Sequence, residues 1–219
     1  MALRIQNNVE AFNALRQLTQ TTSKAAKAME RLSSGYRVNR ASDDAAGLAI
    51  SEKMRSQIGG VAQAQRNAQD GVSLVQTAEG ALTEVHSMLQ RIRDLKVQSE
   101  NDTLNSDDLG AIRKEIKALG EEIGDIQSDT KFNGISLLNG SGATATVSFQ
   151  VGANAGEQIT ADTSTISGLS TIAGLTASTA DATVDAISIA NVDSAIQAVS
   201  TRRADLGATQ NRLEHRLNN

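Results

Sequence analysis

The side chains that most often perform catalysis or bind metals are few and scattered in this sequence. The 219 residues include no cysteine and two histidines, so thiolate chemistry and cysteine metal sites are excluded. The histidines, His86 and His215, have no carboxylate cluster at metal-ligand spacing beside them. Gly59 and Gly60 lack the Lys-Ser/Thr of a phosphate-binding loop, and no nucleophile-elbow motif supports a Ser–His–Asp triad. We therefore expect no catalytic residue, no metal and no cofactor.

The composition favours long helices over a compact enzyme domain. Three phenylalanines, one tyrosine and no tryptophan leave few large side chains for a globular core or a ligand pocket. Proline is absent, and an internal proline would break a helix at a cost of about 3 kcal/mol. The net charge of −4 indicates no general affinity for nucleic acid. No window of about 20 apolar residues is present, so we expect no membrane insertion.

Apolar residues in alternating steps of three and four predict a long helix over residues 45–99. Its predicted stripe is Met54, Ile58, Val61, Ala68, Val72, Val75, Ala78, Leu82, Val85, Leu89 and Ile92. The same pattern predicts helices over 106–129 and 192–219. The polar stretch ENDTLNS predicts a turn that folds the second helix back against the first. The predicted N-caps are Ser42, Ser106 and either Asn191 or Asp193.

A β-like region separates the second and third of these helices. Asn-Gly dipeptides and the alternation of Val147, Phe149 and Val151 with polar residues predict a hairpin region over about 134–161. Residues 162–190 are rich in Ser, Thr, Ala and Gly and predict a short, weakly structured surface segment, either a linker or a functional loop. Residues 1–33 predict a helix that orders only against a partner. The fold class is therefore mainly α: an elongated antiparallel bundle of long coiled-coil-like helices with a small β-hairpin region.

Several blocks of the sequence are distinctive. The most specific is ERLSSGYRVNRASDDAAGLAISEKMRSQIGG at residues 30–60. The others, in chain order, are QNNVEAFNAL, RNAQDGVSLVQTAEGALTEVHSMLQRIRDLKVQS, TKFNGISLLNG, FQVGANAGEQI and VSTRRADLGATQNRLEH. Together these ordered blocks resemble bacterial flagellin, the subunit of the flagellar filament. Hook–filament junction proteins share a similar terminal plan and are the near alternative. The uninterrupted QTAEGALTEV and QNRLEH blocks favour the filament subunit.

The resemblance implies a domain plan for the chain. Residues 1–33 match the amino-terminal helix of the filament's inner tube, 34–44 match the connecting spoke, and 45–219 match the outer-tube rod. The resemblance assigns filament assembly to residues in the first two segments: Ile5, Val9, Phe12, Arg37, Arg40, Asp43 and Asp44. The family continues beyond QNRLEH into a carboxy-terminal inner-tube helix, so we expect this sequence to be a flagellin truncated at that end.

The resemblance also implies recognition by a Toll-like innate-immune receptor. The family motif LQRVREL is represented here by residues 89–95, LQRIRDL. The expected receptor-binding residues are Gln90, Arg91, Leu95 and Gln98 on one helix and Glu115 on the next. An Arg fork, an apolar anchor and a nearby carboxylate together form a plausible binding hot spot. Lateral filament contacts or a solvated face are the competing interpretations of these residues.

The expected function is a structural one. The chain would polymerise with other flagellin subunits into an extracellular filament of the bacterial flagellum used for motility, after passage through the flagellar type III export apparatus. The first alternative is a truncated flagellin that does not polymerise and acts only as receptor ligand or antigen. The second is the junction protein, and the third is a generic coiled-coil scaffold.

Overall fold

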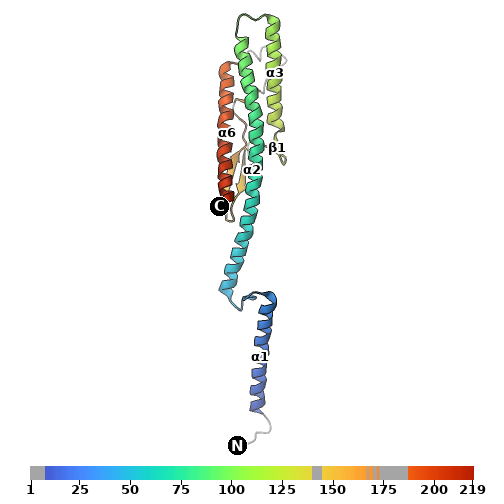
Figure 1. Cartoon of the computed structure of the whole chain (residues 1–219), viewed down its shortest axis with the longest axis vertical. Coiled ribbons are helices and arrows are strands. Elements are labelled where there is room, and N and C mark those ends of the chain that lie inside the picture. Colours follow the sequence, from blue (N-terminus) through green and yellow to red (C-terminus); the bar gives the residue numbers. More distant parts are fainter. Residues whose placement is uncertain (1–7, 140–144, 167, 170–171, 173–186) are drawn as a thin grey trace. The chain divides into compact units, whose positions relative to one another are not determined.

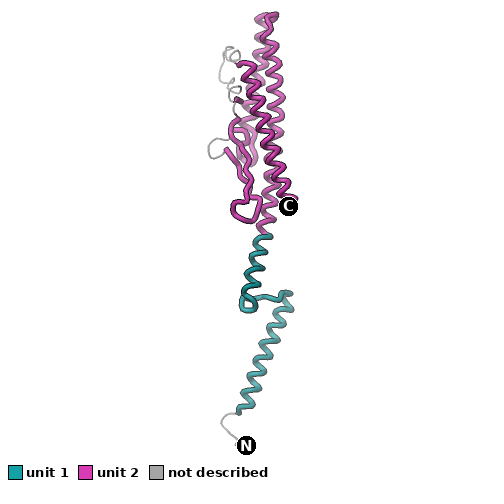
Figure 2. The backbone as a smooth tube through the Cα atoms, turned by 90° about the vertical axis from the view of Figure 1, so that its left-hand side faces the viewer, with its two compact units in different colours: residues 1–58 teal, residues 59–219 magenta. Residues whose placement is uncertain are grey.

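The computed structural model describes residues 8–139, 145–166, 168–169, 172 and 187–219 (Figure 1). Four long helices lie within these residues: α1 (Val9–Ser34), α2 (Ala45–Ser99), α3 (Ser106–Asp129) and α6 (Ile189–Asn218). Two short antiparallel hairpins complete the described structure. The chain divides into two compact units, residues 1–58 and 59–219 (Figure 2). The prediction of a mainly helical chain with a small β-hairpin region is confirmed.

The helices of the second unit form a bundle around one apolar core. Both α3 and α6 run antiparallel to α2 (Figure 1). A narrow apolar stripe on each helix cannot be shielded from water alone, so the three stripes face one another. Fully buried members include Leu82 and Leu89 of α2, Ile116 of α3, and Val199 and Leu213 of α6. The bundle is therefore held together by mutual burial along its length.

The predicted stripe of α2 is buried over only part of its length. Within the second unit it is buried from Ala64 onward. The earlier members Met54, Ile58 and Val61 are 59%, 71% and 57% exposed, so their predicted burial is wrong for this chain. Leu74, which the predicted stripe omitted, is 2% exposed and belongs to the core.

The helix N-caps differ from those predicted. The side chain of Asp44 accepts a hydrogen bond from the backbone N–H of Gly47 at 2.8 Å, so Asp44 and not Ser42 caps α2. Asn105 caps α3 through the N–H of Asp108, and Ser188 caps α6. These corrections have one cause: neighbouring Ser, Asn and Asp residues have similar cap preferences, so the sequence alone does not rank them.

The β region consists of two hairpins. Strands β1 (Lys131–Phe132) and β2 (Ile135–Ser136) join through Asn133 and Gly134, both at positive φ. Strands β3 (Thr146–Gln150) and β4 (Gln158–Asp162) pair antiparallel. Asn67 of α2 donates to the carbonyl of Gln150 at 3.0 Å, which ties the second hairpin to the bundle.

Most of residues 162–190, which their composition predicts to be a weakly structured surface segment, lie outside the described residues. Four described members depart from that prediction: Ile166, Leu169, Ile172 and Ile187 are each at most 4% exposed and belong to the core. The mean composition concealed these single apolar residues among Ser, Thr and Ala.

The first unit contains α1 and the segment that follows it. Helix α1 begins after the N-cap Asn8 and has no buried residue. It ends at Gly35, whose φ of 72° is the left-handed conformation that glycine adopts without a Cβ penalty. A helix was predicted over residues 1–33, and α1 occupies residues 9–34 with none of its side chains buried.

Candidate functional site

Among the residues that the structure describes, no group of three or more His, Cys, Asp or Glu side chains could hold a metal ion. No described helix is both long and apolar enough to cross a lipid bilayer. The candidate functional features are therefore surfaces, namely exposed apolar stripes and exposed ion pairs on helices.

The segment between α1 and α2 is fixed by charged contacts. The Arg40 guanidinium donates to the Glu30 carboxylate at 3.0 Å. The backbone N–H of Asp43 donates to the Arg40 carbonyl at 2.9 Å. The Asp43 carboxylate also lies 3.9 Å from Lys27 and 3.8 Å from Arg31 on the last turns of α1. The structure thus brings Arg40 and Asp43, two residues assigned to assembly, together against the end of α1.

The other residues assigned to assembly are spread over the first unit. Asp44 caps α2 and is half-buried, whereas Arg37 is exposed. Val9 and Phe12 on α1 are 64% and 58% exposed. Ile5 lies outside the described residues. Of the seven residues assigned to assembly, the apolar Val9 and Phe12 and the charged Arg37 and Arg40 are therefore accessible to another molecule.

Exposed apolar side chains form two stripes in the first part of the chain. On α1, the largest are Leu15, Leu18, Met29 and Leu32, each more than half exposed. On α2, the stripe comprises Ile50, Met54, Ile58 and Val61, each at least 57% exposed. Large exposed apolar patches on a soluble chain mark interaction surfaces. Sequence periodicity identified Met54, Ile58 and Val61 of the second stripe, but it omitted Ile50 and did not predict that the stripe is exposed.

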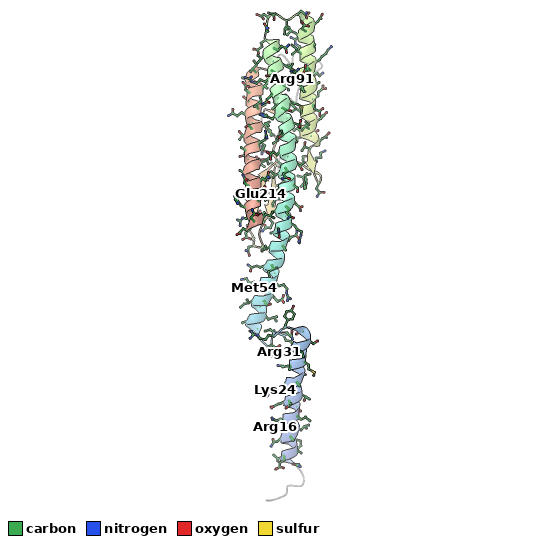
Figure 3. All side chains as sticks on the ribbon, viewed as in Figure 1. Arg16, Lys24, Arg31, Met54, Arg91 and Glu214 are labelled. Carbon is green, nitrogen blue, oxygen red and sulfur yellow. The ribbon has the colours of Figure 1, made fainter. Side chains whose placement is uncertain are left out.

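An exposed ion pair joins α2 to α3 in the second unit. Arg91 lies on α2 (labelled in Figure 3). Its Nη2 lies 2.7 Å from the Glu115 carboxylate, and its Nε donates to the same oxygen at 2.9 Å. The two side chains are 55% and 44% exposed. The Gln90 amide bonds the His86 ring at 3.0 Å, and Gln98 is exposed. The structure therefore places Gln90, Arg91, Gln98 and Glu115 at the surface.

Leu95 requires a correction. Its side chain is 2% exposed and lies in the core with Ile92 and Leu89. The prediction of an exposed apolar anchor beside Arg91 is therefore wrong. The sequence held a signal for this, because Leu95 continues the steps of three and four that define the buried stripe. Leu95 supports the surface from below and does not form part of it.

The sequence analysis missed several long-range ion pairs of the described residues, including Arg203 of α6 with Glu79 of α2 at 3.9 Å. Arg93 of α2 donates to Asp193 of α6 at 2.7 Å, and this hydrogen bond raises the pKa of Arg93. Arg202 of α6 pairs with Asp162 at 2.5 Å and donates to the Ser164 hydroxyl at 2.9 Å. Burial raises the pKa of Asp162, but hydrogen bonds from Ser164 and Arg202 outweigh it and the pKa is lowered. No local motif reveals such partners, because they are distant in sequence.

The family model and the similar sequences agree with one another. The family model of the bacterial flagellin N-terminal helical region matches residues 5–143. The sequence is 46% identical to a flagellin of Bacillus subtilis strain 168, over 99% of this chain and 82% of that protein. It is 50% identical to a flagellin of Halalkalibacterium halodurans, over 98% of this chain and 79% of that protein.

Solved structures are similar as well. The crystal structure of Bacillus cereus flagellin is 34% identical, with a TM-score of 0.60 over 70% of this chain and 88% of that one. A putative flagellar hook-associated protein from Vibrio parahaemolyticus matches with a TM-score of 0.63 at 19% identity. At that identity the second match indicates a shared fold only.

Proposed function

Because this chain belongs to the bacterial flagellin family, we propose that it is a structural subunit of the flagellar filament and polymerises through its helices. Its relatives at 46% and 50% identity are flagellins, which supports the structural role. The domain plan extends this proposal: residues 1–33 form the inner-tube helix, 34–44 the spoke and 45–219 the outer-tube rod. Motility is the process that such a filament serves.

One observation supports polymerisation most strongly. Helix α2 buries its apolar stripe from Ala64 to Leu95 but leaves the stripe exposed from Ile50 to Val61. Four large apolar side chains in regular order, each more than half exposed, are costly in water at about 25 cal/mol per Å². Contact with neighbouring helices in a filament would remove that cost. Many modest contacts of this kind add up over a repeated assembly.

Motility provides the test. The chain is expressed in a bacterium whose own flagellin gene is deleted, and swimming and surface filaments are scored. Replacement of Met54 and Ile58 together by Gln should abolish filaments, because the apolar stripe is lost. The control, Ser56→Gln, introduces the same side chain between these two positions and should leave filaments unchanged. Absence of filaments with the unmodified chain would favour a flagellin that does not polymerise.

We also propose that the α2–α3 surface is the ligand for a Toll-like receptor of the host. The Arg91–Glu115 pair supports this, since both side chains are about half exposed and already held in place. An Arg that is preorganised by a carboxylate forms charge-assisted hydrogen bonds at low entropic cost. Gln90 and Gln98 supply additional exposed amides on the same helix, while Leu95 fixes the backbone beneath them.

Receptor binding is measured with the purified receptor ectodomain. Arg91→Ala should weaken binding by about thirtyfold, the effect of a hot-spot residue worth about 2 kcal/mol. Arg66→Ala, an exposed arginine elsewhere on α2, is the matched control and should change affinity less than twofold. Equal affinities for both variants would remove this surface from the proposal. The Arg91 variant must retain the helical content of the parent chain.

The location of the protein follows from the same proposal. A filament subunit acts outside the cell, on the flagellum, and we propose that the flagellar type III export apparatus delivers it there. The exposed α1 supports this, because a helix without buried residues unfolds at little cost for passage. Deletion of the export apparatus should retain the chain in the cell, and secretion without the apparatus would contradict this route.

A further inference from the structure

Helix α1 has two faces of opposite character. An apolar stripe follows steps of four and three along one side: Ala11, Leu15, Leu18, Thr22, Ala25, Met29 and Leu32. Its large members are strongly exposed, from 59% for Leu15 to 85% for Leu32. By helical spacing, the basic residues of α1 lie on the opposite side: Arg16, Lys24, Lys27 and Arg31, with the exposed Val9 among them. They outnumber the helix's two acidic residues, although the whole chain has a net charge of −4.

Hydroxyl groups on this helix do not interrupt the apolar face. The Thr22 hydroxyl, in the middle of the stripe, donates to the Leu18 carbonyl at 2.6 Å. Thr19, beside the stripe, donates in the same way to the Leu15 carbonyl at 2.9 Å. With its proton bonded inside the helix, each threonine presents its methyl group outward. The stripe can therefore enter an apolar environment without leaving a hydroxyl donor unsatisfied.

The stripe is poorly suited to a second copy of the same helix. Three of its seven positions are occupied by the small side chains of Ala11, Thr22 and Ala25. Interlocking of two helices needs large side chains that fill complementary holes. A fluid lipid surface needs no such match, since acyl chains and headgroups fill the gaps.

The charge on the opposite face specifies the kind of surface. Lys27 and Arg31 lie within 4 Å of Asp43, which partly neutralises them. Arg16 and Lys24 have no acidic partner within 4.0 Å among the described residues. Basic side chains on the polar face of an amphipathic helix attract anionic lipid headgroups while the apolar face enters the boundary of the acyl chains.

We propose that α1 of the unassembled chain binds the surface of an anionic lipid bilayer, lying in the plane of the interface without spanning it. The apolar stripe from Leu15 to Leu32 enters the headgroup region, and Arg16 and Lys24 contact lipid phosphates. This inference goes beyond the filament role. It uses the helix that assembly is proposed to cover, so it applies to single subunits and not to the filament.

The test uses the full 219-residue chain and vesicles. Binding is measured by flotation with vesicles of phosphatidylcholine containing 30% phosphatidylglycerol, and with vesicles of pure phosphatidylcholine. We expect binding to the anionic vesicles that is at least tenfold stronger. Raising the salt from about 0.1 M to 1 M shortens the screening length from about 10 Å to 3 Å and should weaken binding several-fold.

Matched variants separate the two faces. Leu15→Gln with Leu18→Gln should reduce binding at least tenfold, while Gln17→Ala with Gln20→Ala, on the polar face, should leave it within twofold. Glutamine and alanine are both good helix formers, and α1 has no buried residue, so these variants keep their fold. Circular dichroism checks this.

A further pair of variants tests the basic face by replacing two of its charged residues. Arg16→Gln with Lys24→Gln should cost about fivefold for each charge. The control Lys114→Gln with Lys131→Gln removes two exposed charges from the second unit and should have no effect.

Two results would overturn the proposal. The first is equal binding to anionic and neutral vesicles, or no binding to either. The second is self-association of the chain in sedimentation experiments without lipid. If Leu15→Gln with Leu18→Gln abolished this self-association but left vesicle binding unchanged, the stripe would bind a second copy of the chain. Filament formation in the motility test is independent of both results, so either proposal can fail alone.

Discussion

Ile92 and Ile58 are the same residue type on the same helix, but α2 buries Ile92 completely and leaves Ile58 71% exposed. Replacing each by alanine removes the same atoms from two environments. The comparison isolates the contribution of mutual burial within the bundle, because helix propensity changes equally in both variants.

The expected cost differs by several kcal/mol. Truncation of a buried isoleucine to alanine costs about 2–5 kcal/mol, from lost transfer energy and the cavity that remains. Ile92 is 0% exposed and belongs to a core cluster with members from all three helices of its unit, so a value of about 3 kcal/mol applies. Ile58→Ala should change the free energy of unfolding by no more than about 0.5 kcal/mol. For a chain of this size, 3 kcal/mol corresponds to a fall in Tm of about 6–12 °C.

Urea titration followed by far-ultraviolet circular dichroism measures both variants of the monomeric chain. The midpoint should fall for Ile92→Ala and stay near the parent value for Ile58→Ala. Similar losses for the two variants would refute the reasoning, because they would mean that the first part of α2 is also buried in the single chain. A third variant, Val97→Ala, lies at a 51% exposed site on the same helix and should behave as Ile58→Ala does.

Two glycines of α2 give a second comparison: Gly80→Ala should stabilise the chain by about 0.5–1 kcal/mol in urea titration, because nothing lies within 4 Å of the added methyl group. Gly71→Ala should not stabilise it, because the added methyl group meets the Phe149 ring at 3.2 Å; an equal gain for both variants would contradict the close contact. Acid titration tests Asp162, whose pKa is lowered in the folded chain. Its contribution to the free energy of unfolding is complete above the ordinary carboxyl pKa near 4. That contribution is lost as the pH falls through the lowered pKa of the folded state. Arg202→Gln should therefore flatten the dependence of stability on pH below about 4, and an unchanged slope would exclude the ion pair as its cause.

The long helices could be predicted because periodicity and the lack of proline are local properties of the sequence. The spacing that indicated α2 and α3 requires no knowledge of their partners. The burial of a residue does depend on the helices packed against it. Ile58 and Ile92 both belong to the apolar stripe of α2, and only Ile92 lies in the core shared with α3 and α6. The predicted N-caps were wrong for a related reason. Asn105 and Ser106 are both good N-cap residues, and the tertiary fold selects one of them.

The candidate surfaces could be predicted only in part. The resemblance located Arg91 and Glu115, and the structure places them 2.7 Å apart. It did not reveal that Leu95 is buried, because a motif records residue types and not the direction of a side chain. Ile166 and Leu169 were missed because a mean over a Ser-rich segment conceals single apolar residues that reach the core.

Seeded assembly tests the central claim most directly: that the exposed apolar stripe of α2 is covered by neighbouring subunits. Short fragments of flagellar filament are mixed with the purified chain, and sedimentation and electron microscopy follow the mass and length of the fragments. The account predicts that the fragments lengthen as the chain enters the pellet, and that Met54→Gln with Ile58→Gln prevents this. Fragments of constant length, with the chain remaining in the supernatant at every concentration, would contradict it.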